Sequence, residues 1–592
     1  MEDLRWEDGG MRETRTMGTL GSTEPVPLNP EFERLADEAF LELTAMEPVR
    51  ASWLGLHGHN DGQLPTRSPD SMSAAWNVRR RIIRDFEAFD ARRLRLCQAV
   101  DRELTIRALE AELALEDRRP AWRSMPQLYL RDVIDGLYVI LLREYGSLEQ
   151  RGEDLVSRLR QTPGLLAAAR ENLLNPPALF TEQAALLAQM TADFLDDEVI
   201  PFVARLPRTL RSAGDTAAAE ARLAVMGYHD YLAGSLMAAS RGEFCIGKNA
   251  FNRLLRDRQM IPYDADDLVV LGGKIYHESL RTIRAAAGRI RSGRSWSILL
   301  NELKDDHPEP EKVLDAYTRT IAAARAFVVE RRLAALPEED GLRVVPTPAF
   351  GRALFPRTRY LHPAPFENSC TGTVWVTVPR PADSPEKIHF LLRGHGRAVI
   401  PVLAVHEGYP GHHLHTLAYG RQPRRLRALF PSDVLFEGWA LHCEELMREH
   451  GFLADPRVCV MQLHGVLWRA CRVLVDVGLH TGIMTFSEAV TFLVRKGRMD
   501  RPAALAEVRR CCESPTQPAS WGAGKSLLER LMDDCRDLSP SGVEDRVIRE
   551  TVMSCGNLPV ELARKQLGLK RSGEDVAAPR PVGRPARRAG GA

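Results

Sequence analysis

Apolar residues recur at spacings of three and four along most of this chain, and this pattern restricts the possible fold more than any other feature. The pattern runs through residues 73–116 and again through residues 312–336. Such spacing places apolar side chains on one face of an α-helix, where other helices can bury them. Segments that contain Pro or Gly are expected to end helices at 162–164, 174–177, 261–263 and 306–310. The sequence therefore predicts a mostly α-helical fold with many helices.

A strand pattern is confined to one short part of the chain. The segment TGTVWVTVP, residues 371–379, alternates β-branched and aromatic residues with smaller ones. The segment GLRVVPTP, residues 341–348, is expected to pair with it. We therefore expect one small β-sheet near residues 340–380 within the helical body.

Both ends of the chain are polar and carry little apolar bulk. Residues 1–29 end in PVPLN, and residues 571–592 are mainly Pro, Arg, Gly and Ala, so we expect a disordered leader and a disordered basic tail. The leader lacks the apolar core of a signal peptide. No segment is expected to reach the roughly 20 apolar residues that cross a bilayer. These features predict a cytoplasmic protein without a membrane partner.

Charge and cysteine content exclude two classes of function. Lys and Arg total 80 while Asp and Glu total 79, so we expect no nucleic-acid partner. The ten cysteines are scattered apart from Cys511 and Cys512, and the absence of a CxxC pair argues against a zinc site built from cysteines. A chain of 592 residues exceeds what one hydrophobic core usually serves. We predict an N-terminal helical region over 30–335 and a second region over 336–570.

The second region contains a histidine and a carboxylate at the end of an apolar segment, His406 and Glu407. In zinc hydrolases with the HExxH motif, the second histidine follows one helical turn later and the glutamate acts as general base. The candidates here are His412 and His413, six and seven residues after His406. On a straight helix His412 would face away from His406, and His413 would lie too far from it along the axis. Pro410 and Gly411 can break the helix. A bulge there favours His412 as the second ligand, with His413 as the alternative.

A third ligand is expected from a carboxylate on a following helix. Glu437 lies in the apolar segment FEGWAL, where an unpaired carboxylate would be costly. It follows His412 by 25 residues, which is enough for a loop and a returning helix. Two histidines and one glutamate leave one position open on Zn²⁺, which is typical of a catalytic rather than a structural zinc site. A chance His-Glu pair followed by a turn is the alternative interpretation.

Polar residues in the apolar segment 465–480 fall within an arc of about 80° on a helix. They are Arg469, Arg472, Asp476 and His480. A solvated stripe is one interpretation, and the lining of a cavity is the other. In the second case Asp476 would orient a zinc-bound imidazole, Arg472 would hold a substrate carboxylate and His480 would stabilise an oxyanion. Glu444 lies seven residues after Glu437 and is expected either behind a ligand or in a surface pair with Arg448.

The segments HEGYPGHHLH and EGWALHCEEL together resemble the bacterial family called domain of unknown function 885. Further resemblance lies in SWLGLHGHND, VPTPAF, RACRVLVDVGLHTG and SPTQPASWGAGK. That family looks related to gluzincin peptidases, which use His, His and Glu ligands on a mostly helical frame with a deep central cleft. In some gluzincins the second histidine follows a glycine, as His412 follows Gly411. The chain departs from the family at His442 and Trp521, where the family usually has tyrosines.

The resemblance implies a zinc-dependent metallopeptidase that acts on small peptides, with residues 336–570 as its metallohydrolase catalytic region. Glu407 would be the base, and Tyr409, His480 or Arg472 would assist the oxyanion. His413, Glu444 and Asp476 would surround the ligands. Two other functions remain open: a non-catalytic zinc-binding protein, and a zinc amidohydrolase that acts on a non-peptide amide.

Overall fold

The mostly helical fold predicted from the sequence is confirmed in a computed structural model that describes residues 28–569, except 59, 353, 421–423 and 540–541. The predicted basic tail and residues 1–27 of the predicted leader lie outside the described residues. The last leader residue, Asn29, belongs to the fold, because its side chain accepts hydrogen bonds from the backbone N–H groups of Glu31 and Phe32. It thereby caps the first helix.

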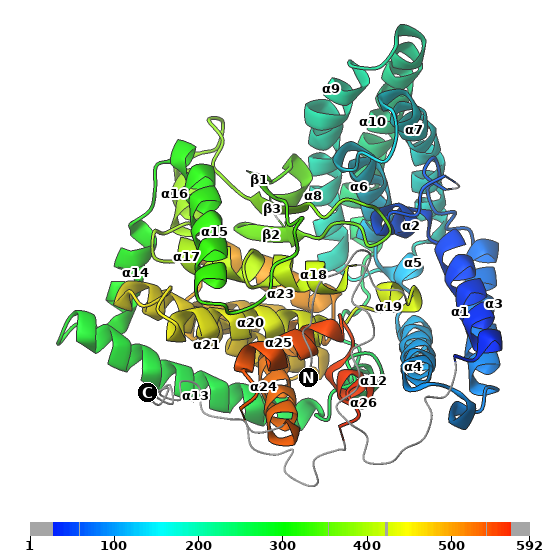
Figure 1. Cartoon of the computed structure of the whole chain (residues 1–592). Helices are drawn as coiled ribbons and strands as arrows, with labels where there is room; N and C mark the ends of the chain where they lie inside the picture. Colours follow the sequence, from blue (N-terminus) through cyan, green and yellow to red (C-terminus); the bar gives the residue numbers. More distant parts are fainter. Residues whose placement is uncertain (1–27, 59, 353, 421–423, 540–541, 570–592) are drawn as a thin grey trace.

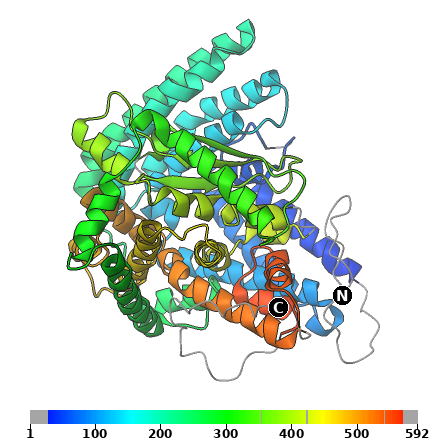
Figure 2. The ribbon, with the colours of Figure 1, turned by 60° about the vertical axis from the view of Figure 1, so that its left-hand side comes forward.

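The N-terminal helices lie mainly along the right-hand side of Figure 1, and those between residues 148 and 231 extend at the top of Figures 1 and 2. They are α1 (Pro30–Ala45), α2 (Pro48–Leu54), α3 (Pro69–Glu87), α4 (Leu96–Arg118), α5 (Ala121–Ser124), α6 (Gln127–Leu142), α7 (Leu148–Asn172), α8 (Ala178–Phe194), α9 (Ile200–Val203), α10 (Arg208–Tyr231) and α11 (Met237–Ala239). Four more precede the sheet: α12 (Lys248–Asp257), α13 (Ala265–Ile290), α14 (Trp296–Asp305) and α15 (Val313–Glu330).

One proline does not end its helix. We expected a break at residues 162–164, but Pro163 lies inside α7, and that expectation is wrong. Leu159 before it and Leu165 and Leu166 after it are buried in one hydrophobic cluster. Burial of the same helix face on both sides offsets the cost of about 3 kcal/mol that a proline brings to a helix interior.

The predicted small sheet is present and contains three strands, β1 (Leu342–Pro346), β2 (Thr358–Leu361) and β3 (Gly372–Val376). The central strand β3 pairs in parallel with β1, so that Leu342 lies opposite Gly372. It pairs in antiparallel orientation with β2, which forms an edge of the sheet. Every residue of β3 is buried. The sheet therefore lies inside the protein, with α17 packed against its edge strand β2.

The remaining helices lie around this sheet and, in Figure 1, largely below it. They are α16 (Pro385–Arg393), α17 (Ile400–Glu407), α18 (His412–Tyr419), α19 (Leu426–Leu429), α20 (Asp433–Glu449), α21 (Pro456–His480), α22 (Phe486–Arg495), α23 (Arg501–Glu513), α24 (Gln517–Leu538), α25 (Asp545–Ser554) and α26 (Val560–Gln566).

Hydrophobic clusters join residues from both sides of position 335, the end of the predicted N-terminal helical region. The largest core joins Phe32 and Leu104 of the first helices to Val405 and Leu558 of the last ones. A second core belongs to α6–α10 and includes Trp375 of the sheet. Parts of the chain that are distant in sequence are therefore packed together in one core.

The long apolar helix α21 is a core helix. By length and composition it could cross a membrane, so our expectation that no segment approaches that limit is wrong for this helix. However, 83% of its most apolar window is buried inside the protein. Neighbouring helices cover it, as the strong packing of α13 and α24 on α21 shows.

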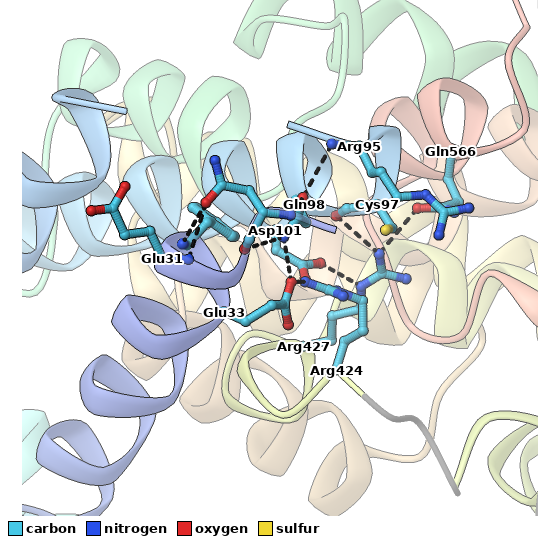
Figure 3. A network of polar contacts seen from close by, with 11 residues as sticks. Glu31, Glu33, Arg95, Cys97, Gln98, Asp101, Arg424, Arg427 and Gln566 are labelled. Atoms are coloured by element: carbon cyan, nitrogen blue, oxygen red, sulfur yellow. Dashed lines mark hydrogen bonds and ion pairs between the residues drawn. The ribbon is translucent and has the colours of Figure 1, made fainter. Parts of the chain in front are cut away.

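A polar network ties α1 and α4 to the segment between α18 and α20 (Figure 3). Asp101 of α4, which is 2% exposed, accepts a hydrogen bond from Arg427 Nε at 2.7 Å and forms a second ion pair with Arg424. Arg424 also reaches Glu33 of α1 at 2.8 Å, and Arg427 reaches Gln566 of α26. The network joins the start of the chain to the segment that leads into α20.

Replacing Asp101 with asparagine should lower the thermal stability of the protein. The change leaves two largely buried guanidinium groups with only part of their neutralising charge, and breaking such a pair costs about 3 kcal/mol. We expect a fall of several degrees in the melting temperature by differential scanning fluorimetry. The control is Glu38→Gln, which removes an ion pair whose partners Arg34 and Glu38 are exposed, and it should leave the melting temperature nearly unchanged.

Candidate metal centre

The turn after α17 brings two histidines together. The helix ends at Glu407 and α18 begins at His412, so the Pro-Gly step breaks the helix as predicted. The backbone N–H of Gly411 donates to the Val405 carbonyl at 3.1 Å. A Cβ atom on Gly411 would lie 2.1 Å from the His406 carbonyl oxygen, so only glycine fits there. As a result the His406 and His412 rings lie with their centroids 4.7 Å apart.

Glu437 of α20 completes a group of three donors. Its Oε2 atom lies 3.7 Å from His406 Nε2 and 3.5 Å from His412 Nε2. The ligand atoms of all three residues lie within 4.8 Å of one another. All three side chains are buried. The structure therefore brings the three predicted residues together, with His412 rather than His413 in the group.

The donor set fits a zinc ion. Ligands at the usual Zn–N and Zn–O distances of about 2.0–2.1 Å in tetrahedral geometry lie about 3.3 Å apart, close to the separations found here. Glu437 Oε2 is buried and has no hydrogen-bond partner among the described residues. A buried carboxylate oxygen without a donor is costly unless a cation satisfies it. Two imidazoles and one carboxylate are also typical ligands of zinc.

The electrostatics of the group keep Glu437 ionised. Burial alone would raise the pKa of Glu437, but the imidazoles of His406 and His412 outweigh it and lower that pKa to about 2. Burial likewise disfavours a charged His406, whereas Glu437 and Glu444 raise its pKa to about 9. Without a cation, the three side chains thus hold one another by charge.

Glu444 supports the first ligand from behind. Its Oε1 atom lies 2.9 Å from His406 Nδ1, and its side chain is fully buried. A proton on Nδ1 that is held by this carboxylate leaves Nε2 free to face the other ligands. Glu444 is seven residues after Glu437 on α20, so one helix face supplies both carboxylates. Of the two positions considered for Glu444, the structure shows the one behind a ligand.

Replacing Glu444 with glutamine should weaken zinc binding by about 10- to 100-fold, because the amide no longer fixes the ring and tautomer of His406 by charge. Competition of the purified protein with a zinc-sensitive dye measures this change. The matched control is Glu445→Gln, the next residue on α20, whose carboxylate contacts Lys525 instead of a ligand. Equal affinities for the Glu444→Gln variant and the unmodified protein would contradict the proposed support.

Glu407, the predicted base, is held by the edge strand of the sheet. Its Oε1 atom accepts a hydrogen bond of 2.8 Å from the Thr358 hydroxyl at the start of β2. Glu407 directly follows the ligand His406 and is buried. Sequence reasoning missed Thr358, because its contact with Glu407 joins residues 49 positions apart.

Two predicted residues near the ligands point away from them. His413 Nδ1 lies 3.0 Å from the Tyr360 hydroxyl, and its Nε2 lies 3.2 Å from the Asp340 carbonyl oxygen. The Tyr409 hydroxyl donates to the carbonyl oxygen and side chain of Asp340, at 2.6 and 2.9 Å. Both side chains thus connect the metal-binding turn to the segment before β1. This arrangement corrects the oxyanion role predicted for Tyr409, since its hydroxyl is already engaged there.

Two residues of α21 lie in a different environment from the one predicted. Asp476 Oδ2 accepts from the backbone N–H of Ala519 at 3.1 Å, at the start of α24, and His480 Nε2 lies 2.8 Å from the Cys511 carbonyl oxygen. His480 also packs against Phe244 and Phe251. Neither residue joins the group of three donors. The carboxylate behind His406 is Glu444, not Asp476, and His480 is engaged elsewhere.

Arg472 lies beside the centre in a group around Trp521. Its guanidinium carbon is 4.2 Å from the Trp521 ring centroid, and its Nε is 2.5 Å from Glu507 Oε1. The Trp521 ring stacks over His406 at 6.1 Å. Arg469 lies 3.7 Å from Glu444 and also faces Trp521. The predicted stripe therefore divides: its N-terminal half faces the centre and its C-terminal half does not.

Helix α20 also holds the turn that carries His412. The Trp439 indole N–H donates to the Pro410 carbonyl oxygen at 2.9 Å, and the Cys443 thiol lies 3.4 Å from the same oxygen. Sequence reasoning missed both contacts. The backbones of α20 and α24 are in close contact at Gly438 and Gly524. A Cβ on Gly438 would lie 2.5 Å from the Gly524 carbonyl carbon, so no larger residue fits there.

Comparisons with known proteins give a family and a fold. The chain is similar to a candidate lipoprotein of unknown function from Shewanella oneidensis, at 21% identity and a TM-score of 0.72, over 91% of this chain and 100% of that one. It is also similar to a candidate lipoprotein from Colwellia psychrerythraea, at 15% identity and a TM-score of 0.77, over 91% and 98% of the two chains. At these identities the likeness shows the fold alone. No curated protein matches the chain. The sequence profile of a bacterial family of unknown function matches residues 48–567, most of the chain, which therefore belongs to that family, DUF885.

Proposed function

We propose that this protein is a zinc-dependent hydrolase that cleaves short peptides. The observation that supports it most directly is the convergence of His406, His412 and Glu437, whose ligand atoms lie within 4.8 Å of one another. Glu407, a fourth buried ionisable side chain, follows the first ligand directly. A structural zinc site has four protein ligands, whereas a set of three leaves room for a reactant.

Zinc held by these residues would supply a Lewis acid that polarises water and the scissile carbonyl. Glu407 would take a proton from the attacking water and return it to the leaving amine. The Thr358 hydroxyl orients one oxygen of this carboxylate, so that the other can serve the proton transfer. Glu444 keeps His406 in one tautomer. Trp521 covers one side of His406 and limits the access of bulk water.

The choice of a peptide as the substrate rests on the resemblance to gluzincin peptidases. A zinc amidohydrolase that acts on a non-peptide amide would use the same residues. A non-catalytic zinc-binding protein is favoured by one specific observation. Where the family usually has a tyrosine, Trp521 offers only an indole N–H, and this group has no hydrogen-bond partner among the described residues.

Elemental analysis followed by a peptide digest tests the proposal. Purified protein should contain close to one zinc per chain, and His406→Ala protein should contain almost none. A peptide library digested by the zinc-loaded protein should yield products that the His406→Ala protein does not form. Absence of zinc would overturn the proposal. Zinc without turnover of any peptide would favour the non-catalytic protein, or the amidohydrolase if a library of non-peptide amides were cleaved.

The location is a separate proposal. We propose a cytoplasmic location for this chain, whereas the two structural relatives are described as candidate lipoproteins. Fractionation of cells that express the full chain tests this inference, and recovery of the protein with the membrane fraction would overturn it.

A further inference from the structure

The two histidines of the metal centre are oriented by different contacts. Each ring directs its Nε2 atom toward Glu437, at 3.7 Å for His406 and 3.5 Å for His412. Nδ1 of His406 lies 2.9 Å from the Glu444 carboxylate. Nδ1 of His412 is buried and has no hydrogen-bond partner among the described residues. Because a hydrogen bond at the second ring nitrogen normally fixes a ligand histidine, another contact must orient His412.

The phenyl ring of Phe436 covers one face of His412. The two rings are nearly parallel, at 11°, and their centroids are 3.9 Å apart. Phe436 immediately precedes Glu437 on α20, and consecutive residues of a helix point in directions about 100° apart. The helix therefore contacts His412 in two ways, because Glu437 approaches Nε2 at the edge of the ring and Phe436 lies against its face. Tyr360 of β2 also stacks on His412, with the ring centroids 6.2 Å apart.

The stacking contact restricts the rotation of the imidazole. The torsion about the Cβ–Cγ bond of a histidine has only broad preferences, so this bond alone does not fix the direction of Nε2. Turning the His412 ring about it would drive the edge of the ring into the phenyl group, which already lies at van der Waals distance. Phe436 thus keeps Nε2 of His412 directed at Glu437.

Phe436 also contacts the helix that carries His412. Its ring stacks on His415, with centroids 5.9 Å apart, and His415 lies three residues after His412 on the same side of α18. Nε2 of His415 lies 3.3 Å from the Gly556 carbonyl oxygen, just after α25. One phenyl ring of α20 therefore contacts both the ligand and the next turn of the helix that presents it.

We propose that Phe436 is a positioning residue of the metal centre, whose ring takes the place of the hydrogen bond that His412 lacks. Stacking of two aromatic rings contributes about as much as one hydrogen bond, so it can hold a ligand in the same way. The inference rests on the zinc-binding part of the proposed function. It does not depend on the reaction or on the substrate.

The zinc affinity of Phe436 variants tests the inference. Phe436→Leu keeps an apolar side chain but removes the ring, and we expect the affinity to fall about tenfold. Phe436→Tyr keeps the ring and should retain most of the affinity of the unmodified protein. Competition of the purified proteins with a zinc-sensitive dye measures these affinities. Phe436→Met provides the same comparison if the Phe436→Leu protein does not fold.

The matched control is Phe452→Leu. Phe452 is also half-buried, and its ring packs against Phe327 of α15, with centroids 5.3 Å apart, rather than against a ligand. Both leucine variants should have a lower melting temperature than the unmodified protein, but only Phe436→Leu should bind zinc more weakly. Loss of stability is thereby separated from loss of ligand orientation.

Crystal structures of the metal-free unmodified and Phe436→Leu proteins give a second measurement, which does not require zinc. In the variant the His412 ring should be rotated, with Nε2 turned away from Glu437. In the unmodified protein it should lie against Phe436.

The outcomes separate this inference from the proposed function. Equal zinc affinity of the unmodified and Phe436→Leu proteins, an equal loss in Phe436→Tyr, or an equal loss in Phe452→Leu would overturn the inference and leave the hydrolase proposal standing. If the unmodified protein bound no zinc, the proposed function would fail. The crystal structures would then decide alone: a rotated His412 ring in the variant would support the positioning role, and an unchanged ring would overturn it.

Discussion

Replacing Glu407 with glutamine is expected to lower peptide hydrolysis by about 10³-fold, a typical loss when a general base is removed. The amide keeps the shape of the side chain and can still accept the hydrogen bond from Thr358. It cannot take a proton from water. Because Glu407 is not among the three convergent donors, the zinc content should stay near one per chain. Initial rates on a peptide found in the library digest, measured with elemental analysis of the same samples, give both quantities.

The control for this experiment is Glu339→Gln, an exposed glutamate before β1, which should leave rate and zinc content unchanged. If the Glu407→Gln protein hydrolysed the peptide at the rate of the unmodified protein, another group would have to be the base. If it lost its zinc, the replacement would have disturbed the ligands, and the rate would say nothing about proton transfer.

The neighbouring histidines His412 and His413 should behave in opposite ways when each is replaced with alanine. His412→Ala removes one of three ligands, so zinc affinity should fall by more than about 100-fold, beyond the effect typical of outer-shell residues, and activity should fall with it. His413 faces Tyr360 and Asp340 instead, so His413→Ala should retain zinc at saturating concentrations. Dye competition with the two purified variants measures the affinities.

The His413→Ala protein is nevertheless expected to be less stable than the unmodified protein. The replacement deletes the hydrogen bonds of the imidazole with the Tyr360 hydroxyl and the Asp340 carbonyl, and each such hydrogen bond contributes about 0.5–1.5 kcal/mol to stability. The melting temperature should therefore fall while zinc binding persists. The reverse result, with zinc lost from the His413→Ala protein and kept by the His412→Ala protein, would show that the turn after α17 delivers the other histidine.

The convergence of His406, His412 and Glu437 could be predicted from the sequence because each residue has a recognisable local context. His406 and Glu437 interrupt apolar helices, and Pro410 with Gly411 marks a place where the helix can break between the histidines. The two strands of the sheet that carry β-branched residues were also predictable. The short strand β2 was not, since its four residues (TRYL) carry no strong alternation. Because β2 was not predicted, the contact of Thr358 with Glu407 was not predicted either.

The polar stripe on α21 shows why part of the site could not be predicted. The periodicity of a sequence indicates which face of a helix a residue occupies. It does not indicate which residues of other helices lie beside it at that position along the axis. Arg469 and His480 share a face, yet 11 residues at 1.5 Å each place them about 16 Å apart along the helix. Arg469 therefore reaches Glu444, whereas His480 reaches Cys511. Partners contributed by other helices decide the role of each residue.

Helix α20 carries the ligand Glu437, the supporting Glu444, and Trp439, which holds the turn before His412. A small shift of α20 along its axis would move all three side chains together and change mainly their positions relative to His406. The touching backbones at Gly438 and Gly524 prevent such a shift. Under the proposed function, adaptation of this centre to a larger cation is thus expected to require changes at these two glycines, which lie outside the group of three donors.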